Sequence, residues 1–143
     1  AAATSPLHPG DVLVSGGMRY DGDALLTPES STLHVYNSND DSEETIEAGM
    51  ITPRWFHRAE VLPGQGVLLS GGFTSFDSTA TDSLEMYASS DGQMHSAGPD
   101  HLSTPRAGHA SVAMPGGRAL PVGGANGDEL LGSGEIYTAQ TSE

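Results

Sequence analysis

The sequence contains a long internal repeat, and this repeat restricts the possible fold more than any other feature. Residues 53–72 return as residues 105–124, with Pro-Arg, His, Pro-Gly and Gly-Gly all recurring at the same spacing of 52 residues. A partial copy, residues 9–17, lies near the start of the chain and also ends in Gly-Gly. Four matched features at one fixed spacing indicate structural units of about 50 residues, a period typical of solenoids, propellers and other arrays.

Each unit is predicted to contain short β-strands separated by turns. Apolar runs that end in Gly-Gly are typical of strands buried on both faces, and 19 glycines with 9 prolines suit short strands better than helices. The units span approximately residues 1–52, 53–104 and 105–143. In the second and third units the predicted strands are residues 57–62, 66–70, 83–87, 93–97, 109–113, 118–122 and 134–138. In the first unit they are residues 12–14, 32–36 and 45–50, preceded by a truncated strand at residues 5–8.

The pattern of strands is incomplete at both ends of the repeat. The first unit lacks a good inner strand and the third lacks an outer one, so the sequence accounts for about two and a half to three four-stranded antiparallel sheets. A closed propeller needs about four to eight such blades, and fewer leave open faces and unpaired edges. We therefore expect either other copies of this chain, giving a homo-oligomer, or a larger parent chain to complete the ring. Contacts that do not close would instead produce a filament.

Within this pattern the sequence resembles the kelch-repeat β-propellers, particularly the longer blades of galactose-oxidase-like and secreted kelch proteins. The resemblance extends from about Pro9 to Tyr137 and implies an all-β fold of kelch-type propeller blades. Two features depart from it: the aromatic residue that usually follows the repeated Tyr is missing, and Pro121 interrupts the third Gly-Gly strand. The residues that carry the resemblance are the glycine pairs 16–17, 71–72 and 123–124, the repeated Tyr36, Tyr87 and Tyr137, and Arg54, Arg106, His57 and His109.

The charge of the chain limits its partners. The formal net charge is −14, from 19 acidic and 5 basic residues, and all five basic residues are Arg. Such a surface repels nucleic acid and anionic lipid, and it favours cations or basic protein partners. No apolar run is long enough for a membrane-spanning helix. An extracellular or secreted setting is favoured over others, with residues 1–6 as a mature end after signal removal or a cut within a longer protein.

No catalytic or metal-binding set stands out in the sequence. The repeated Arg and His residues are expected to be structural, with the arginines bonding to carbonyls or acids between blades. The chain has no cysteine, so it cannot form the Tyr–Cys cross-link of the radical copper oxidases that the resemblance suggests. The Glu-Asp-His triad of the iron-dependent kelch proteins is broken because Tyr87 stands in the Glu position before Asp91 and His95. Residues 21–23 and 39–41 carry the oxygen ligands that Ca²⁺ prefers, although turn formation explains both.

Three connections of different length lie at the same place in the three units, which is typical of loops on a binding face. They are residues 18–31, 73–83 and 125–133. The predicted anchors for a partner on these loops, within an acidic rim, are Arg19, Tyr20, Phe73 and Phe76. Trp55 and Phe56 either contribute to the same surface, where aromatic rings anchor proteins or stack on sugars, or fill space near a central channel.

Three functions agree with these observations. The first is a non-enzymatic kelch propeller segment that acts as a protein-interaction or assembly module. The second is part of a secreted carbohydrate-active or oxidase enzyme with its catalytic residues elsewhere. The third is a structural subunit of a filament.

Overall fold

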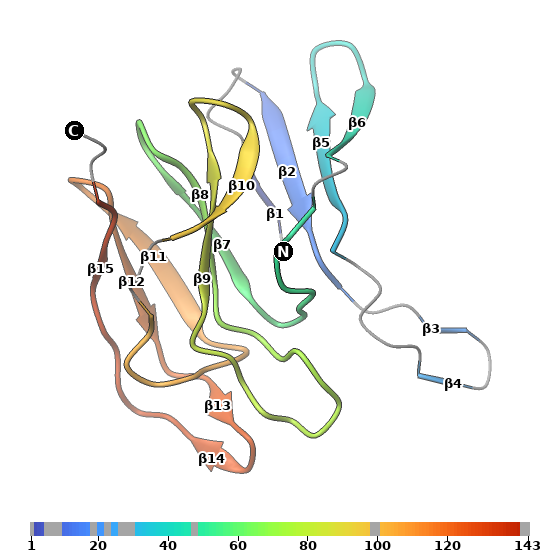
Figure 1. Ribbon diagram of the computed structural model, residues 1–143. Helices are drawn as coiled ribbons and strands as arrows, with labels where there is room; N and C mark the ends of the chain where they lie inside the picture. Colours follow the sequence, from blue (N-terminus) through green and yellow to red (C-terminus); the bar gives the residue numbers. More distant parts are fainter. Residues whose placement is uncertain are drawn as a thin grey trace.

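The computed structural model describes residues 2–4, 10–17, 20–21, 24–25, 31–46, 49–97 and 101–140. Within these ranges the regular elements are all β-strands, arranged as three antiparallel sheets and two small hairpins (Figure 1). The described part of the chain includes no helix long and apolar enough to cross a membrane. The all-β antiparallel fold predicted from the repeat is therefore confirmed.

The middle sheet is the most complete of the three. Its strands are β7 (Arg58–Leu62), β8 (Gly66–Ser70), β9 (Leu84–Ala88) and β10 (Gln93–Ser96), which pair antiparallel in chain order. All five residues of β8 are buried, as expected for an apolar strand without polar alternation that is covered on both faces. The four strands predicted from the second unit are confirmed to within one residue at each end.

In the first sheet, the positions predicted for the first and the outer strand are wrong. Its strands are β1 (Ala2–Thr4), β2 (Asp11–Ser15), β5 (Leu33–Asn37) and β6 (Ser42–Ile46), in the order β1-β2-β5-β6. The sequence predicts the first strand at residues 5–8, which are outside the described residues, but it lies before them, at Ala2–Thr4. Thr4 pairs with Val12, so the connection between these two strands is longer than in the middle sheet. The outer strand begins at Ser42 rather than at residue 45, because Asp40 accepts a hydrogen bond of 3.0 Å from the Ser42 amide and closes the turn early.

The third sheet has three strands, β11 (Ala110–Met114), β12 (Arg118–Val122) and β15 (Tyr137–Thr138). The first two agree with the prediction. The strand predicted at residues 134–138 is reduced to two residues and an isolated bridge between Val122 and Gly134. No outer strand follows it within the described residues, as the sequence indicates.

A connection between the second and third strands projects from the same end of every sheet (Figure 1). In the first and third units it contains a hairpin, formed by β3 (Tyr20–Asp21) with β4 (Ala24–Leu25) and by β13 (Ala125–Asn126) with β14 (Glu129–Leu130). In the middle unit it is the loop of residues 73–83. The three variable connections therefore share one end of the molecule.

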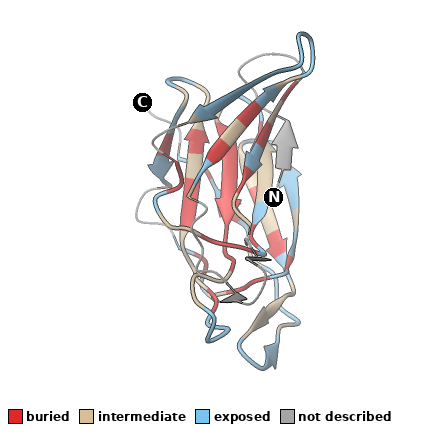
Figure 2. Cartoon of the chain, turned by 90° about the vertical axis from the view of Figure 1, so that its right-hand side faces the viewer, coloured by how far each residue is buried: buried red, intermediate tan, exposed pale blue. Residues whose placement is uncertain are grey.

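Two hydrophobic clusters fill the spaces between the sheets, and buried residues run along the central strands (Figure 2). The repeated tyrosine shows how the sheets stack: Tyr87 and Tyr137 are buried in these clusters, whereas Tyr36 in the first sheet is exposed. The cluster between the first and middle sheets contains Leu13, Leu33, Val35, Met50, Val67, Leu69, Tyr87 and Met94. The cluster between the middle and third sheets contains Leu62, Leu68, Leu84, Leu102, Ala119, Tyr137 and Ala139.

Candidate functional site

The repeated arginine of the middle unit is fully buried and ion-paired. The Nη1 atom of Arg54 donates to the carbonyl oxygens of Gly71 at 2.9 Å and Ser83 at 3.1 Å. Its Nη2 atom donates to the Ser83 hydroxyl at 2.7 Å and to Oε1 of Glu85 at 2.5 Å. The guanidinium therefore ties the segment before β7 to the end of β8 and the start of β9.

The third unit repeats this arrangement. Arg106 donates to the carbonyl oxygens of Gly123 at 2.8 Å and Ser133 at 2.9 Å, and it pairs with Glu135 at 3.4 Å. In both units the partners belong to the arginine's own sheet. The prediction that these arginines bond to acids and carbonyls is confirmed. The arginines lie against the preceding unit, whose glycine amides donate to their carbonyl oxygens, but their side chains bond within their own unit rather than across to that neighbour.

The repeated histidine connects each sheet to the one before it. Nε2 of His57 shares a hydrogen bond of 2.8 Å with the Ser15 hydroxyl, and Nε2 of His109 shares one of 3.0 Å with the Ser70 hydroxyl. Burial, together with nearby cations, lowers the pKa of His57 to about 3 and of His109 to about 4, so both rings are neutral at pH 7.

These pairs are unsuited to act as a serine nucleophile with its base. All four side chains are buried, and among the described residues neither Nδ1 atom has a partner that would orient the ring. The same pair also occurs at both junctions between sheets. The His–Ser hydrogen bond is therefore a structural link between neighbouring units.

The first glycine of each pair makes room for the following unit. A Cβ atom on Gly71 would lie 2.2 Å from the carbonyl oxygen of Arg106, and one on Gly16 would lie 2.4 Å from that of Arg54. Both glycines also have positive φ angles, 60° and 62°. At the corresponding Gly123 a Cβ atom would lie 3.6 Å from its nearest neighbour, the Leu131 carbonyl oxygen, which is an ordinary van der Waals distance. No further sheet follows it within the described residues.

An aromatic cluster lies at the end of the molecule that carries the variable connections. The ring of Trp55 lies 6.1 Å from that of Phe73 and 5.2 Å from that of Phe76, and Phe56 meets Phe73 edge-on at 6.2 Å. Trp55 is buried and forms the base of the cluster, whereas Phe56 and Phe76 are exposed. The structure thus brings together two of the predicted anchors, Phe73 and Phe76, with the two aromatic residues whose role the sequence leaves open.

The backbone of Phe56 is in a conformation that favours glycine. Its φ is 52°, and Gly108, at the same position of the third unit, has a φ of 62°. A left-handed conformation costs a non-glycine residue about 1–2 kcal/mol. The amide of Gly108 donates a hydrogen bond of 2.8 Å to the Phe56 carbonyl. The comparison of the two copies shows a Phe in a Gly position, but the sequence alone does not indicate the left-handed backbone.

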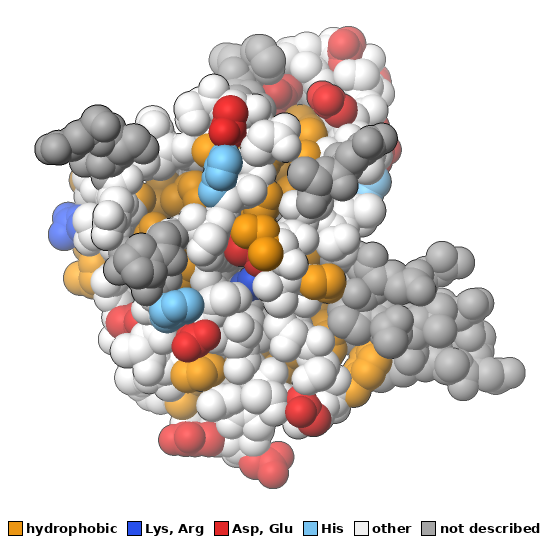
Figure 3. All heavy atoms as spheres, viewed as in Figure 1, with side chains coloured by type: hydrophobic (Ala, Val, Ile, Leu, Met, Phe, Trp, Pro, Cys, Tyr) orange, Lys and Arg blue, Asp and Glu red, His pale blue; other side chains and the backbone are white. Residues whose placement is uncertain are grey.

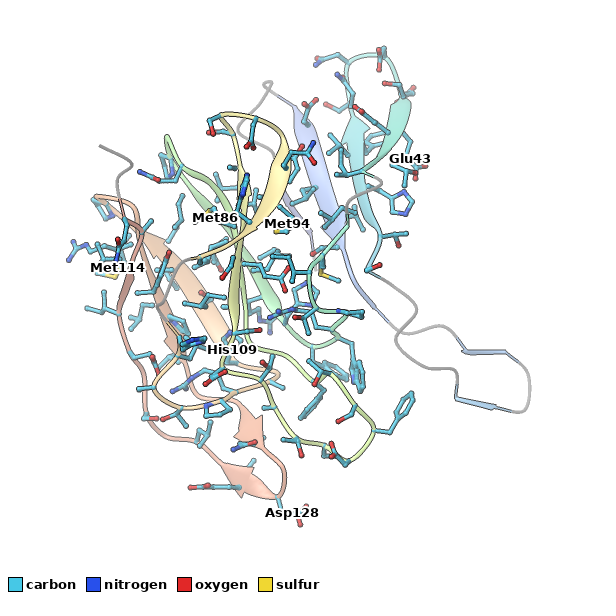
Figure 4. The ribbon with its side chains drawn as sticks, in the orientation of Figure 1. Glu43, Met86, Met94, His109, Met114 and Asp128 are labelled. Carbon is cyan, nitrogen blue, oxygen red and sulfur yellow. The ribbon has the colours of Figure 1, made fainter. Side chains whose placement is uncertain are left out.

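Acidic residues border this cluster. The Gly127 amide of the β13–β14 turn donates to the Ser78 carbonyl at 2.9 Å, which places Asp77 and Asp128 on either side of this contact. Hydrogen bonds from Ser75 and Thr79 lower the pKa of Asp77, so its charge persists well below neutral pH. Figure 4 shows Asp128 projecting from the hairpin tip, and in Figure 3 acidic side chains gather over this end.

The other two predicted anchors lie outside the part of the structure that is described. Arg19 is not among the described residues, and although Tyr20 begins β3, its side chain is not among the described side chains. Phe73 and Phe76 are therefore the two anchors whose positions are established.

The oxygen-rich segments predicted as calcium candidates differ from each other. In the second segment the side chains of Asp40 and Asp41 are engaged in the turn, by the Ser42 amide and by the Tyr36 hydroxyl. In the first, residues 22 and 23 lie outside the described residues. Among the residues that the structure describes, no three acidic or histidine side chains gather as a metal site.

A groove of about 640 Å³ lies between the middle and third sheets, away from the aromatic cluster. It contains the Asp91–His95 pair, whose side chains are 2.8 Å apart. Tyr87, which stands in the Glu position of the iron-dependent proteins, is buried on the other face of the sheet, in the cluster shared with the first sheet. The groove therefore offers two ligands and not the triad.

The fold and these sites define an all-β protein of stacked antiparallel sheets with an aromatic surface at one end. A scan against protein-family models and a search of curated proteins both found no match.

Proposed function

We propose that the chain is a segment of a kelch-type β-propeller that acts as a non-enzymatic protein-interaction module. Its ring is completed by other copies or by a larger parent chain. The partner binds at the end that carries the aromatic cluster and presents basic side chains to it. The repeated His–Ser links support the propeller, because each unit makes the same contact to the unit before it, as neighbouring blades do. The repeated Arg–Glu pairs also support it, because they give successive units the same internal contacts.

The observation that carries the binding site is the exposed ring of Phe56. This side chain is 60% exposed although its backbone bears the cost of a left-handed conformation. The third copy avoids that cost with glycine. Residues in a strained backbone conformation cluster at functional sites, and a ring that is this exposed adds little to the hydrophobic core.

The chemistry of the surroundings selects a basic partner. Aromatic faces attract Arg and Lys side chains through cation–π contacts worth about 0.5–2 kcal/mol each. The aspartates beside the cluster and the net charge of −14 add a favourable field for cations. Trp55 lies at the base of the cluster as the only tryptophan of the chain, so its fluorescence reports directly on occupancy of the site.

The test is a titration of Trp55 fluorescence with a short peptide of alternating arginine and glycine at low salt. We expect saturable binding that weakens about 5–30-fold in Phe76→Ala and in Phe56→Gly, as for loss of an aromatic anchor. Phe56→Gly is especially informative because it relieves the backbone strain and should leave the fold intact. The control Leu130→Ala removes an exposed apolar residue from the same end of the molecule but outside the cluster, and it should bind normally.

Two results would contradict the proposal. One is equal binding by the wild type and by both cluster variants. The other is equal binding of a glutamate–glycine peptide, which would show that charge plays no part. Binding of a neutral oligosaccharide with no affinity for the basic peptide would instead favour the carbohydrate-active alternative.

A further inference from the structure

We propose that copies of this chain associate head to tail, with the free face of the third sheet of one copy packed on the free face of the first sheet of the next. This junction would use the same two types of face as the junctions that already exist within the chain, without their His–Ser hydrogen bond. It does not involve the aromatic cluster, so its test is separate from that of the binding site proposed above.

Each sheet has one face toward the following sheet. In the first two sheets this face carries a leucine and a serine from the second strand, Leu13 with Ser15 and Leu68 with Ser70, and all four are buried. The same positions of the third sheet are Leu120 and Val122. Val122 is 40% exposed, because no following sheet covers it among the described residues.

The free face of the third sheet is apolar across its strands. The register pairs Ala110 with Val122 and Val112 with Leu120, so these four side chains share one face. Ile136, just before β15, is 56% exposed; because its neighbour Tyr137 lies on the buried face, Ile136 extends the free one. An exposed and continuous apolar surface of this kind marks an interaction site.

Each sheet also has a face toward the preceding sheet. In the middle sheet this face carries Val67 and Tyr87, which pair across the strands and are buried against the first sheet. The equivalent residues of the first sheet are Val12 and Tyr36, which pair in the same way. Tyr36 is exposed, and so is Val14 on the same face. This surface is therefore of the type that is buried in the other two sheets.

The two free faces are complementary in type and in charge. The free face of the third sheet corresponds to the face that, in the first two sheets, is covered by the following sheet. The free face of the first sheet corresponds to the face that, in the other two sheets, packs on the preceding sheet. The third sheet presents Arg118, while the first presents Glu43 opposite Tyr36. Figure 4 shows Glu43 and Met114, the cross-strand partner of Arg118, on opposite sides of the molecule, as a head-to-tail contact requires.

The change from serine to Val122 fits the same arrangement. Ser15 and Ser70 each receive a histidine from the next unit. A valine cannot accept that hydrogen bond, so the third sheet is suited to a neighbour that packs by apolar contact. Because the two faces differ, the contact is heterologous, and copies either close into a ring or extend into a filament.

The test uses two variants that block opposite faces. Val122→Glu with Ile136→Glu blocks the third sheet, and Val14→Glu with Tyr36→Glu blocks the first. Sedimentation and light scattering should find the wild type as oligomers whose mass rises with concentration, and each double variant as a folded monomer by circular dichroism. An equimolar mixture of the two variants should form a 1:1 dimer and nothing larger, because it retains one intact junction. Leu130→Glu, outside both faces, should assemble like the wild type.

Conservative substitutions provide a second test if the charged variants fail to fold. The chain has no cysteine, so Val122→Cys and Val14→Cys each introduce a single thiol. A bismaleimide linker should join the two variants to each other far more than either variant to itself. A monomeric wild type at all concentrations, or cross-linking mainly between identical variants, would overturn the proposal. Variants of Phe56 and Phe76 should assemble normally, which keeps this result separate from that of peptide binding.

Discussion

Replacing Glu85 by glutamine should destabilise the protein far more than the same change at Glu135, although the two residues occupy the same position in successive units. Both carboxylates pair with the repeated arginine of their own sheet. They differ in burial: the Glu85 side chain is 3% exposed and that of Glu135 is 19% exposed. The pair of substitutions therefore measures what burial adds to one repeated contact within a single molecule.

The structure sets the expected magnitudes. Glu85 accepts from the amides of Ile51 at 2.8 Å and Thr52 at 3.0 Å as well as from Arg54. A glutamine leaves one donor facing another and Arg54 without its counter-charge, and breaking a buried pair in this way costs about 3–5 kcal/mol. Glu135 lies 3.4 Å from its arginine and within reach of water, so its loss should cost about 1–2 kcal/mol.

Urea unfolding at one fixed protein concentration, followed by circular dichroism and Trp55 fluorescence, would measure this difference. With a slope of about 2 kcal/mol per M, the middle of the range for a small protein, Glu85→Gln should lower the midpoint by about 1.5–2.5 M, and Glu135→Gln by about 0.5–1 M. Equal shifts, or a larger shift for Glu135→Gln, would refute the argument that burial of the ion pair determines its contribution.

Two further predictions concern the junctions between sheets. Because burial depresses the pKa of His57 and His109 in the folded state, the unfolded chain binds more protons below about pH 6.5. Stability should therefore fall from pH 7 to pH 5 by about 2 kcal/mol per histidine, and His109→Gln should remove about half of that loss in urea titrations at the two pH values. An unchanged pH dependence in the variant would contradict this assignment. Gly71→Ala should lower the melting temperature much more than Gly123→Ala. Both glycines have positive φ, but the new Cβ atom at residue 71 would clash with the Arg106 carbonyl oxygen at 2.2 Å, whereas the one at residue 123 would lie 3.6 Å from its nearest atom. Equal losses in calorimetry would show that backbone strain alone is responsible.

Most strands are predictable from the sequence because the same pattern of residues occurs in more than one unit, so each copy supports the assignment of the other. Apolar runs bounded by Pro-Gly and Gly-Gly locate β8 and β12 to the residue. The position of β1 is not predictable, because the loop after it is longer than in the middle unit and shifts the pairing. A strand of three residues is too short to show a periodic pattern, so the sequence does not reveal that this connection is longer.

The candidate site is predictable only in part. The repeated Arg and Glu are visible in the sequence, but Arg54 and Glu85 are 31 residues apart, and nothing in their spacing indicates that they pair. Phe73 and Phe76 follow from their place in a variable loop. Phe56 joins them through a left-handed turn whose carbonyl accepts a hydrogen bond from Gly108 of the next unit, and a contact between two units is not visible in the sequence.

Two departures from the repeat lie on the faces that have no neighbour among the described residues, and both concern polar groups that need a partner when buried. In the first sheet His34 stands where Glu85 and Glu135 stand in the others, and it pairs with Glu43 at 2.6 Å near the surface. A buried acid requires a paired counter-charge, whereas His34 is paired within its own sheet and is only partly buried. In the third sheet Val122 likewise replaces a serine that would have no histidine to bind. Both substitutions leave a side chain that tolerates either water or a neighbouring sheet, which is the requirement for a surface that is free in one state and covered in another.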